Sequence, residues 1–350
     1  MMRASKPLVA LTMGDPAGIG PEVIAGIWSV PQIHEWCQPV VVGSPAVLER
    51  ACKLVARNVK VVEVRAPDEV AATPALAPCL AACATDAASV PAGKVDARGG
   101  QAAYDALIAA AKMALAGEID AIVTAPLSKA ALWQAGHHYP GHTELLAELC
   151  GVNDFAMMLY LGPDEQVRGP HGLGVIHVTL HTALRDAIAA LDEEAILAKI
   201  ELAHASMRPL TGGPPRLGVC ALNPHAGEEG LFGDEETRLI APAVARARGL
   251  GIDAAGPYPA DTLMARARDG EFDAVVAMYH DQGHIALKLL GMHRAVNVTL
   301  GLPIVRTSVA HGTAFDIAWQ GRARTSSMTE AVRVACQLAR YRSIQASPLK

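Results

Sequence analysis

The chain has 350 residues, 51% of them hydrophobic and 19% charged, so it can bury a substantial core in one large or two ordinary domains. Its formal net charge is -5 and its lysines and arginines are scattered, which excludes the basic face typical of nucleic-acid-binding proteins. The apolar stretches are too short to span a bilayer, and the first residues lack the features of a signal peptide. We therefore expect a cytoplasmic protein without a membrane partner. Its seven dispersed cysteines indicate reduced thiols rather than a disulfide framework.

Apolar, β-rich runs alternate with amphipathic stretches along the chain. The runs expected to form strands lie at 8–14, 39–43, 59–64, 120–126, 155–162, 173–180, 216–222, 273–279 and 295–300. Helical patterns lie between several of them, for example at Glu193–Met207 and Glu235–Ala247. This alternation predicts an α/β fold with a largely parallel sheet. The Ala- and Pro-rich segment Ala66–Lys94 has weak patterning, and we interpret it as a loop region with short helical turns.

Three histidines each stand at or just after the end of an expected strand: His181, His225 and His280. Three strand ends can bring three imidazoles around one divalent metal and leave coordination positions open for a substrate. The sequence alone leaves the alternative that each is a hydrogen-bonded strand-end histidine without a metal. His177, four residues before His181, is interpreted as a supporting residue.

A second group of residues is suited to binding an anion. Histidine and threonine can donate at the start of a helix, where free N–H groups and the helix dipole already favour negative charge. Arginine adds a planar fork and lysine a point charge, the usual pair for phosphate or carboxylate. The candidates are His142, Thr143, Lys288, Asn297 and Arg306. Any one of them, taken alone, can equally be a surface residue beside a turn.

The glycine-rich stretch "TMGDPAGIGPE", residues 12–22, directly follows the first expected strand. Its glycines Gly14, Gly18 and Gly20 do not have the GxGxxG spacing of a dinucleotide-binding turn. The turn still points backbone amides toward a ligand. A second candidate for dinucleotide binding is "VAHGTAFDIA", residues 309–318.

Several long motifs occur in one order: "TMGDPAGIGPE", "TAPLSK", "GHTE", "LNPHAGE", "MYHDQG", "NVTLGLP" and "RTSVAHGTAFDIA". Together they resemble the 4-hydroxythreonine-4-phosphate dehydrogenase family (PdxA) of the vitamin B6 (pyridoxine) pathway, over about residues 7 to 323. The resemblance implies an isocitrate/isopropylmalate-dehydrogenase-like fold of two α/β domains with a cleft between them. It also implies a homodimer with active sites at the interface, a divalent metal (Zn, Mg, Mn or Co), and NAD or NADP.

The resemblance assigns roles to particular residues. The metal ligands fall on His181, His225 and His280, the adenosine end of the cofactor on 311–316, and the further active-site carboxylate on Asp261. The phosphate contacts of the substrate fall on His142, Thr143, Lys288, Asn297 and Arg306. Asp261 and Lys288 are the candidates for the general base, and His311, Gly312, Thr313 and Asp316 are those for the cofactor. We expect a first, cofactor-side domain of residues 1–135 with 290–350, and a second, metal- and dimer-side domain of residues 136–289.

The motif "DQGHIALK" bears on the substrate, because the B6-pathway enzymes tend to read "DQGLPVLK" there. It is similar to a paralogous branch that acts on threonate or erythronate 4-phosphate. The dihydrodiol dehydrogenases of terephthalate breakdown share the motif, but we expect them to lack "GHTE" and the arginine of "RTS". The expected activity is therefore metal-dependent, NAD(P)-linked oxidation and decarboxylation of a 4-phosphorylated 3-hydroxy acid. The alternatives are a dihydrodiol carboxylate dehydrogenase and, more remotely, a non-catalytic metal-dependent binding protein.

Overall fold

The computed structural model describes residues 6–83, 86–139 and 141–346. Contacts divide the chain into unit 1, Met1–Asn153 with Leu302–Lys350, and unit 2, Asp154–Gly301. The sequence predicted the first boundary at residue 135, which is 18 residues before 153, and the second at residue 289, which is 12 residues before 301. Helix α6 (His142–Cys150) belongs to unit 1 because Leu145 and Leu146 lie in the same core cluster as Leu107.

Unit 1 is built on a sheet in which every pair of neighbouring strands is parallel. Its order is β3 (Lys60–Val64), β4 (Leu76–Ala81), β2 (Gln38–Gly43), β1 (Leu8–Thr12), β5 (Ala121–Thr124) and β12 (Arg306–Val309). The central strands β1 and β5 are almost wholly buried, as expected for a parallel sheet covered on both faces.

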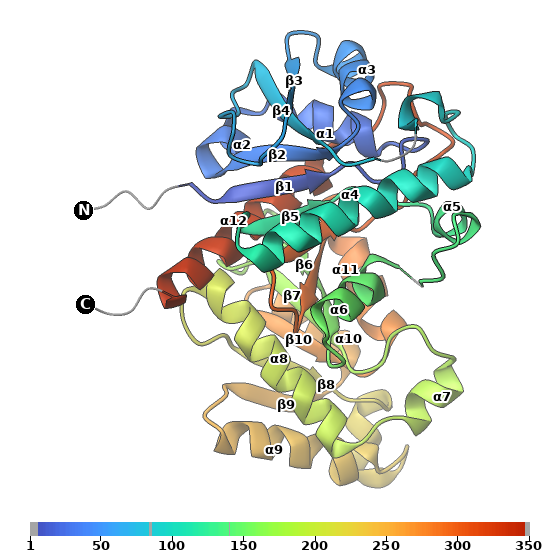
Figure 1. The fold of residues 1–350 in the computed structure, drawn as a ribbon. Coiled ribbons are helices and arrows are strands. Elements are labelled where there is room, and N and C mark those ends of the chain that lie inside the picture. Colours follow the sequence, from blue (N-terminus) through green and yellow to red (C-terminus); the bar gives the residue numbers. More distant parts are fainter. Residues whose placement is uncertain (1–5, 84–85, 140, 347–350) are drawn as a thin grey trace. The chain divides into compact units, whose positions relative to one another are not determined.

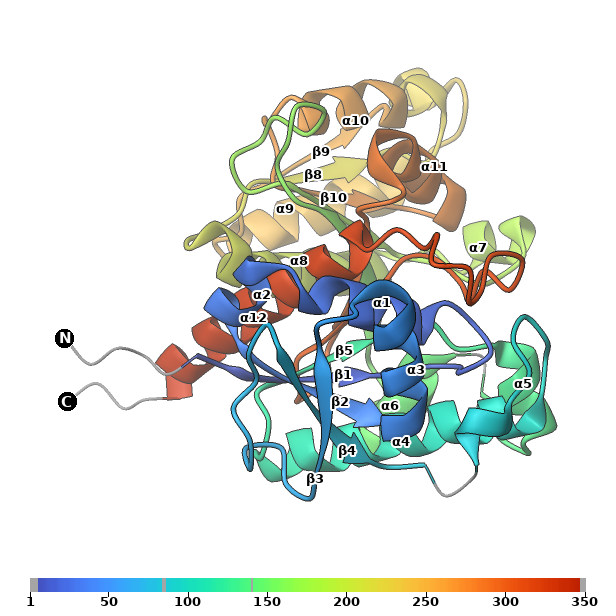
Figure 2. The ribbon, with the colours of Figure 1, turned by 90° about the horizontal axis from the view of Figure 1, so that it is seen from above.

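Helices cover both faces of this sheet (Figures 1 and 2). On one face α4 (Ala97–Ala116) packs on β1, β2 and β5. On the other, α12 (Ser326–Ala346) packs on β5 and β12 and contacts α1 (Gly20–Trp28) and α2 (Pro31–Trp36). The remaining elements of unit 1 are α3 (Pro45–Val55), the 3-10 turn Ala87–Ser89 and α5 (Lys129–Gln134).

Unit 2 has a mixed sheet. Its order is β11 (Val296–Leu300), β6 (Ala156–Leu161), β7 (Leu173–His177), β10 (Ala274–Ala277), β8 (Leu217–Cys220) and β9 (Ala254–Tyr258). Strand β6 is antiparallel to both of its neighbours, whereas β7, β10, β8 and β9 run parallel. The helices are α7 (Leu184–Ala189), α8 (Glu193–Thr211), α9 (Ala241–Gly249), α10 (Ala260–Arg268) and α11 (His280–Gly291). A short helical segment, Pro224–Gly230, and a π-helical one, Glu236–Ile240, precede α9.

The fold confirms the predicted α/β class and the nine expected strands, with trimmed ends. Three further strands, β4, β9 and β12, were not expected. The interpretation of Ala66–Lys94 as loop and short turns is wrong at β4, which pairs with β2 and β3. Its sequence "LAPCLA" contains Pro78, which argues against a strand inside a sheet when only local pattern is considered.

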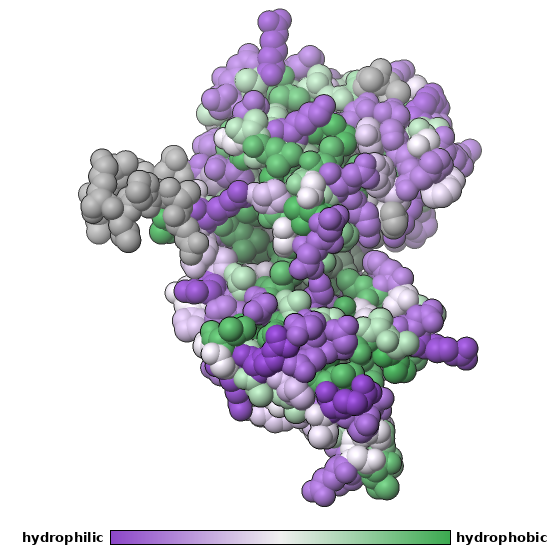
Figure 3. Space-filling view, turned by 60° about the horizontal axis from the view of Figure 1, so that its bottom comes forward, coloured by the Kyte–Doolittle hydropathy of each residue, from purple (hydrophilic) through white to green (hydrophobic). Residues whose placement is uncertain are grey.

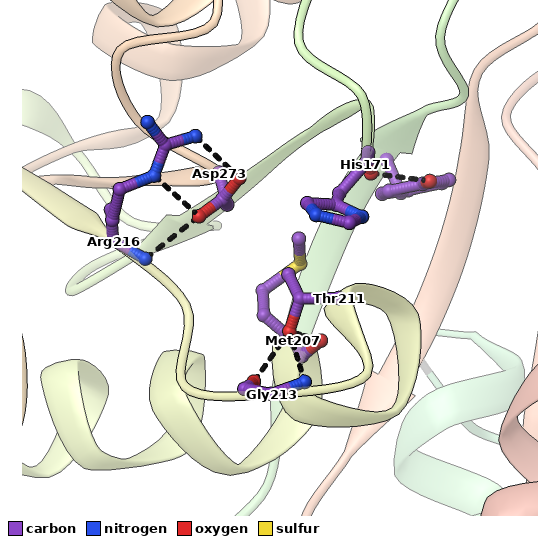
Figure 4. Close-up of polar contacts among 7 residues, drawn as sticks. His171, Met207, Thr211, Gly213, Arg216 and Asp273 are labelled. Carbon is purple, nitrogen blue, oxygen red and sulfur yellow. Dashed lines mark hydrogen bonds and ion pairs between the residues drawn. The ribbon is translucent and has the colours of Figure 1, made fainter.

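An ion pair joins the starts of β8 and β10 in unit 2 (Figure 4). The carboxylate of Asp273, just before β10, accepts hydrogen bonds from the backbone N, Nε and Nη2 of Arg216, just before β8, at 2.8, 3.1 and 3.0 Å. A guanidinium fork on a buried carboxylate fixes the relative position of two strands. This contact lies at the opposite edge of the sheet from the polar motifs.

The surface is mixed in character, and on the face drawn in Figure 3 hydrophobic residues form patches between hydrophilic ones. Within the described part of the chain, no helix is both long enough and apolar enough to cross a membrane. All seven cysteines are free in this structure.

Candidate active site

The order of the parallel strands in unit 2 explains why its polar motifs gather. Carboxyl ends of neighbouring parallel strands meet at one edge of a sheet, where open α/β folds bind ligands. In the order β7, β10, β8, β9, these ends are followed by His181, His280, His225 and Asp261. Residues far apart in sequence therefore share one edge of the sheet.

Four imidazoles lie close together at the ends of β7 and β10. The ring of His280 is stacked on that of His284, with centroids 3.8 Å apart, and lies 6.0 Å from that of His181. His284 Nδ1 is 3.1 Å from His177 Nε2, so these two buried rings share a hydrogen bond. His177, the last residue of β7, thus supports the cluster through its contact with His284. Its partner His284 was not singled out in the sequence.

Two adjoining cavities open at this edge. A cavity of about 430 Å³ is lined by His181 and His280, and one of about 680 Å³ by His225 and Asp261. Tyr279 and Asp281 line both. The predicted histidines and the predicted carboxylate therefore line two neighbouring cavities, each large enough for a small hydroxy acid.

The side chains do not converge as metal ligands in this conformation. No group of three or more His, Cys, Asp or Glu side chains within residues 6–83, 86–139 and 141–346 is arranged to hold a metal ion. His280 Nδ1 contacts Asp281 Oδ1 at 2.6 Å, which leaves Nε2 of this ring as the possible ligand atom. The donor types nevertheless suit a divalent transition metal, and the metal assignment stays a prediction.

Burial keeps two of these imidazoles neutral. Burial, together with the neighbouring His284 and His280, holds the pKa of His177 well below its usual range. Burial and the neighbours His280 and Lys288 lower the pKa of His284 to about 4. A neutral His284 can accept or donate one hydrogen bond, as its contact with His177 requires.

Lys288 and Asn297 also belong to unit 2. Lys288 lies one helical turn after His284 on α11 and is half-buried. Asn297 is on β11 opposite Leu159 of β6. Neither lines the two cavities above, whereas the other base candidate, Asp261, lines the larger cavity together with His225.

The other predicted anion-binding residues form a cationic cluster in unit 1. His142 and Thr143 open α6, whose first residues have no side-chain cap. Arg306, at the start of β12 and only 3% exposed, donates from Nη2 to Thr124 Oγ1 at 2.6 Å. Burial, then the charges of Arg306 and Lys129, hold the pKa of His142 well below its usual range. A helix N-terminus beside cations favours the binding of an anion, and the assignment of these residues to a phosphate stays a prediction.

Burial lowers the pKa of Arg306 itself to about 10, against the opposing influence of Glu144. Such a shift means that the charged guanidinium is poorly solvated where it stands. A bound anion relieves that cost. The cluster is therefore a place where a negatively charged ligand would be favoured.

The two stretches considered for dinucleotide binding lie against one another in unit 1. Ile19 N donates to Thr313 O at 3.0 Å, and a Cβ on Gly18 would lie 2.9 Å from Thr313 O. Glu22 accepts hydrogen bonds from the backbone N of Trp319 at 2.5 Å and of Gly321 at 2.7 Å. The glycine-rich turn thus supports the loop 311–321.

The predicted cofactor residues lie in that loop. His311 Nδ1 contacts the neighbouring carbonyl of Gly312 at 3.0 Å, and Asp316 is exposed. Nothing lies within 4 Å of the place where a Cβ on Gly312 would sit. There is room for a ligand beside the backbone at this point.

Sequence reasoning missed three residues of these clusters. Thr124 and Lys129 are the first and last residues of the quoted motif "TAPLSK", so the motif itself was the available signal. Glu236 hydrogen-bonds the chain just before His225, and no local pattern indicates this contact.

Comparison with known proteins identifies the family. The family described as "Pyridoxal phosphate biosynthetic protein PdxA" matches residues 35–335. The chain is 46% identical to D-threonate 4-phosphate dehydrogenase of Salmonella typhimurium, over 95% of this chain and 98% of that protein. It is 48% identical to 4-hydroxythreonine-4-phosphate dehydrogenase of Beijerinckia indica, over 97% and 96%. The chain belongs to the PdxA family. This confirms the predicted family and the predicted enzyme class of dehydrogenase.

Solved structures of the PdxA family agree. The crystal structure of 4-hydroxythreonine-4-phosphate dehydrogenase from Klebsiella pneumoniae matches with a TM-score of 0.83 at 43% identity, covering 96% of this chain and 99% of that one. A β-decarboxylating dehydrogenase of Thermococcus kodakarensis matches at 13% identity with a TM-score of 0.52, covering 96% and 83%. The latter shows shared fold alone and confirms the predicted fold class.

Proposed function

We propose that this chain oxidises a small 4-phosphorylated 3-hydroxy acid with NAD or NADP and that the product loses CO₂. The observation that carries the phosphorylated substrate is the cluster of Arg306, His142 and Lys129 at the start of α6. A phosphate dianion can accept charge-assisted hydrogen bonds from this cluster, whereas an uncharged ring edge cannot. D-Threonate 4-phosphate, D-erythronate 4-phosphate and 4-phosphohydroxy-L-threonine are the candidate substrates.

The relatives' names support two of these substrates directly, and the residue His284 bears on the choice. The chain reads "DQGHIALK" around His284, the form expected of the threonate branch. We therefore expect D-threonate 4-phosphate to be used better than 4-phosphohydroxy-L-threonine.

We propose that a divalent metal binds at His181, His225 and His280. Two of these rings already lie 6.0 Å apart, and the third borders the adjoining cavity. When bound, the metal supplies Lewis-acid chemistry that makes an alcohol more acidic. Chelation of the metal should abolish turnover, and adding back Zn²⁺, Mn²⁺, Co²⁺ or Mg²⁺ should restore it. Full activity in metal-free protein would contradict this assignment.

Asp261 is our choice for the general base. It lies in the first turn of α10, borders the same cavity as His225, and one of its oxygens, Oδ1, accepts a hydrogen bond from Thr262 N at 2.8 Å. That bond orients the carboxylate and leaves the second oxygen for the hydroxyl proton of the substrate. The carbon that bears this hydroxyl group gives its hydride to the nicotinamide, and the resulting 3-keto acid loses CO₂.

The loop 311–321 is our proposed site for the adenosine end of the cofactor, with His311, Gly312, Thr313 and Asp316 as contacts. Its support is the open space at Gly312 and the rigid backing by the glycine-rich turn. Dinucleotide bound only along Gly14–Gly20 would show that the wrong loop was chosen.

We also propose a homodimer. On α11 the side chains of Ile285 and Leu289, with Met292 just after the helix, are exposed by 56%, 82% and 54% and recur on one helical face. Apolar stripes of this kind mark interaction surfaces. Leu289→Glu should convert a dimer to a monomer in light scattering and lower activity. Leu250→Glu, at a 61% exposed leucine after α9, is the matched control and should leave the dimer intact.

The deciding experiment for the activity follows NAD(P)H absorbance and CO₂ release with a panel of substrates. It compares the three phosphorylated acids with their dephosphorylated forms and with a cis-dihydrodiol carboxylate. We expect at least about 100-fold higher kcat/KM for a phosphorylated acid than for its dephosphorylated form. A terephthalate dihydrodiol dehydrogenase of Burkholderia xenovorans matches this chain at 30% identity and a TM-score of 0.64, covering 95% and 98%. Activity on the dihydrodiol alone would contradict our proposal and indicate a dihydrodiol dehydrogenase instead.

A further inference from the structure

The segment that carries His225 has an unusual backbone. Six consecutive residues have positive φ: 53° at His225, 56° at Ala226, 80° at Gly227, 44° at Glu228, 55° at Glu229 and 97° at Gly230. Residues other than glycine avoid this left-handed region because Cβ approaches the following carbonyl oxygen. A run of this kind persists only where its surroundings impose it. His225 is the first residue of the run, so its imidazole position depends on what holds the segment.

One buried carboxylate holds the segment at its start. Glu236, 4% exposed, accepts hydrogen bonds at Oε1 from the backbone N of Leu222 at 2.8 Å and of Asn223 at 2.7 Å. Its Oε2 accepts from Asn223 Nδ2 at 3.0 Å. The two backbone donors lie three and two residues before His225.

The same carboxylate meets the segment again after His225. A Cβ placed on Gly227 would lie 2.7 Å from Glu236 Oε2, so the backbone at Gly227 passes directly against that oxygen. The chain therefore bends around Glu236, and His225 lies between the two points of contact. A displacement of the carboxylate moves both points.

Glu236 is itself firmly placed. It is the first residue of the π-helical segment Glu236–Ile240, which continues into α9, and such π turns are frequent at functional sites. Burial raises the pKa of Glu236, but hydrogen bonds from Asn223 and Leu222 outweigh it and hold the pKa below its usual range. The carboxylate is thus charged at neutral pH, and hydrogen bonds to a charged acceptor are stronger than neutral ones.

We infer that Glu236 is a positioning residue that holds the imidazole of His225 in place at the cavity edge. The inference rests on the proposed role of His225 in binding a metal. Its neighbour Glu235 provides the contrast: Glu235 Oε2 accepts from a side chain, Asn223 Nδ2, at 2.6 Å rather than from a backbone N–H. Glu236 differs from Glu235 because it accepts hydrogen bonds from two backbone amides.

The test compares Glu236→Gln with Glu235→Gln in the full chain. In Glu236→Gln the amide oxygen can still face the backbone donors, but the amide nitrogen then meets the donor Asn223 Nδ2, so the segment must shift. Zn²⁺ binding to the metal-free protein is measured by competition with a chelating dye. We expect at least about a 10-fold weaker Kd for Glu236→Gln, and less than about a twofold change for Glu235→Gln.

A double-mutant cycle separates positioning from general damage. If Glu236 acts through His225, Glu236→Gln should weaken Zn²⁺ binding no further in a His225→Gln background. Equal weakening with and without His225 would overturn the inference, as would an unchanged Zn²⁺ Kd in the single variant. Circular dichroism checks that each variant folds. Gly227→Ala, which presses on the same carboxylate from the other side, replaces Glu236→Gln in the cycle if that variant fails to fold.

A readout without metal distinguishes failure of this inference from failure of the proposed function. The Cε1–Hε1 NMR signal of His225, assigned by its loss in His225→Gln, should shift in Glu236→Gln and stay in place in Glu235→Gln. If the wild-type protein binds no Zn²⁺ but the signal shifts as stated, the metal proposal fails and the positioning role stands. An unmoved signal in Glu236→Gln overturns the positioning role whether or not Zn²⁺ binds.

Discussion

Replacing Arg306 by methionine should separate the folding of this protein from its activity. The side chain is almost fully buried, and Thr124 Oγ1 is one of its hydrogen-bond partners, at 2.6 Å. Methionine keeps a long unbranched side chain and removes only the charge and its donors. We expect Arg306→Met to fold with near wild-type stability while losing most of its activity on a phosphorylated substrate.

The expected effect on stability follows from two opposing contributions. Burial lowers the pKa of Arg306 to about 10, so the charged form costs about 3 kcal/mol in the folded protein. The variant removes this cost. Leaving the buried hydroxyl of Thr124 without this donor costs roughly 1 to 3 kcal/mol. The free energy of unfolding without ligand should therefore change by less than about 2 kcal/mol, or a Tm shift below about 8 °C. Because the folded-state pKa is depressed, the guanidinium stays charged and its burial cost is fully present at every pH below about 10, so the difference should not vary between about pH 6 and 9.

The effect on catalysis should be much larger. Charge-assisted contacts to phosphate are stronger than neutral ones, so kcat/KM should fall at least about 30-fold, equivalent to about 2 kcal/mol. Activity is measured with D-threonate 4-phosphate. Unfolding is followed by thermal scans with and without 10 mM inorganic phosphate, which is about a hundred times a phosphate Kd of about 0.1 mM. A phosphate-dependent rise in Tm is expected for the wild-type protein and should be absent from the variant.

Arg216→Met is the matched control, because Arg216 pairs with Asp273 at the other edge of the unit 2 sheet (Figure 4). Arg216 is 42% exposed and Asp273 4% exposed, so loss of the fork should cost about 2 kcal/mol after allowance for solvent screening. Its kcat/KM should stay within about threefold of wild type. Our reasoning is refuted if Arg306→Met keeps its activity, or if it loses more stability than Arg216→Met.

Three further predictions concern unit 1. Burial raises the pKa of Asp15 to about 6, with Asp96 adding to the rise and the Ala17 N–H opposing it. The protonated form therefore stabilises the fold below about pH 4, and this contribution, up to about 3 kcal/mol, is lost as the pH rises through about 6. Urea unfolding of Asp15→Asn should lack that pH dependence, and an identical pH profile would contradict the assignment. Glu22→Ala leaves two backbone N–H groups without their acceptor, so it should lower stability by roughly 2 to 4 kcal/mol and raise the cofactor KM more than the substrate KM. Gly312→Val has open space at its Cβ, so its Tm should be unchanged while the cofactor KM rises at least about fivefold, and an unchanged KM would exclude this loop from the cofactor site.

Local pattern in the sequence was sufficient wherever the element carried its own signal. The strands β1, β5, β7 and β10 are runs of buried aliphatic residues, and such runs between helical patterns predict a parallel sheet without further information. The three strands that were missed carry little signal. Pro78 interrupts β4, a Gly-Pro pair lies in β9, and β12 is the short polar "RTSV". They are strands because neighbouring strands pair with them.

The residue types at the candidate site were equally legible, because histidines, an aspartate and an arginine at the ends of apolar runs have little use in a core. The sequence of motifs also determined the family. Tertiary structure decided which of these residues meet. The order β7, β10, β8, β9 brings His181, His280, His225 and Asp261 to one sheet edge, and Glu236 reaches back to the amides before His225. Strand order and contacts of this kind arise from hydrogen bonds and packing between segments distant in sequence, and a local pattern carries no record of its partner.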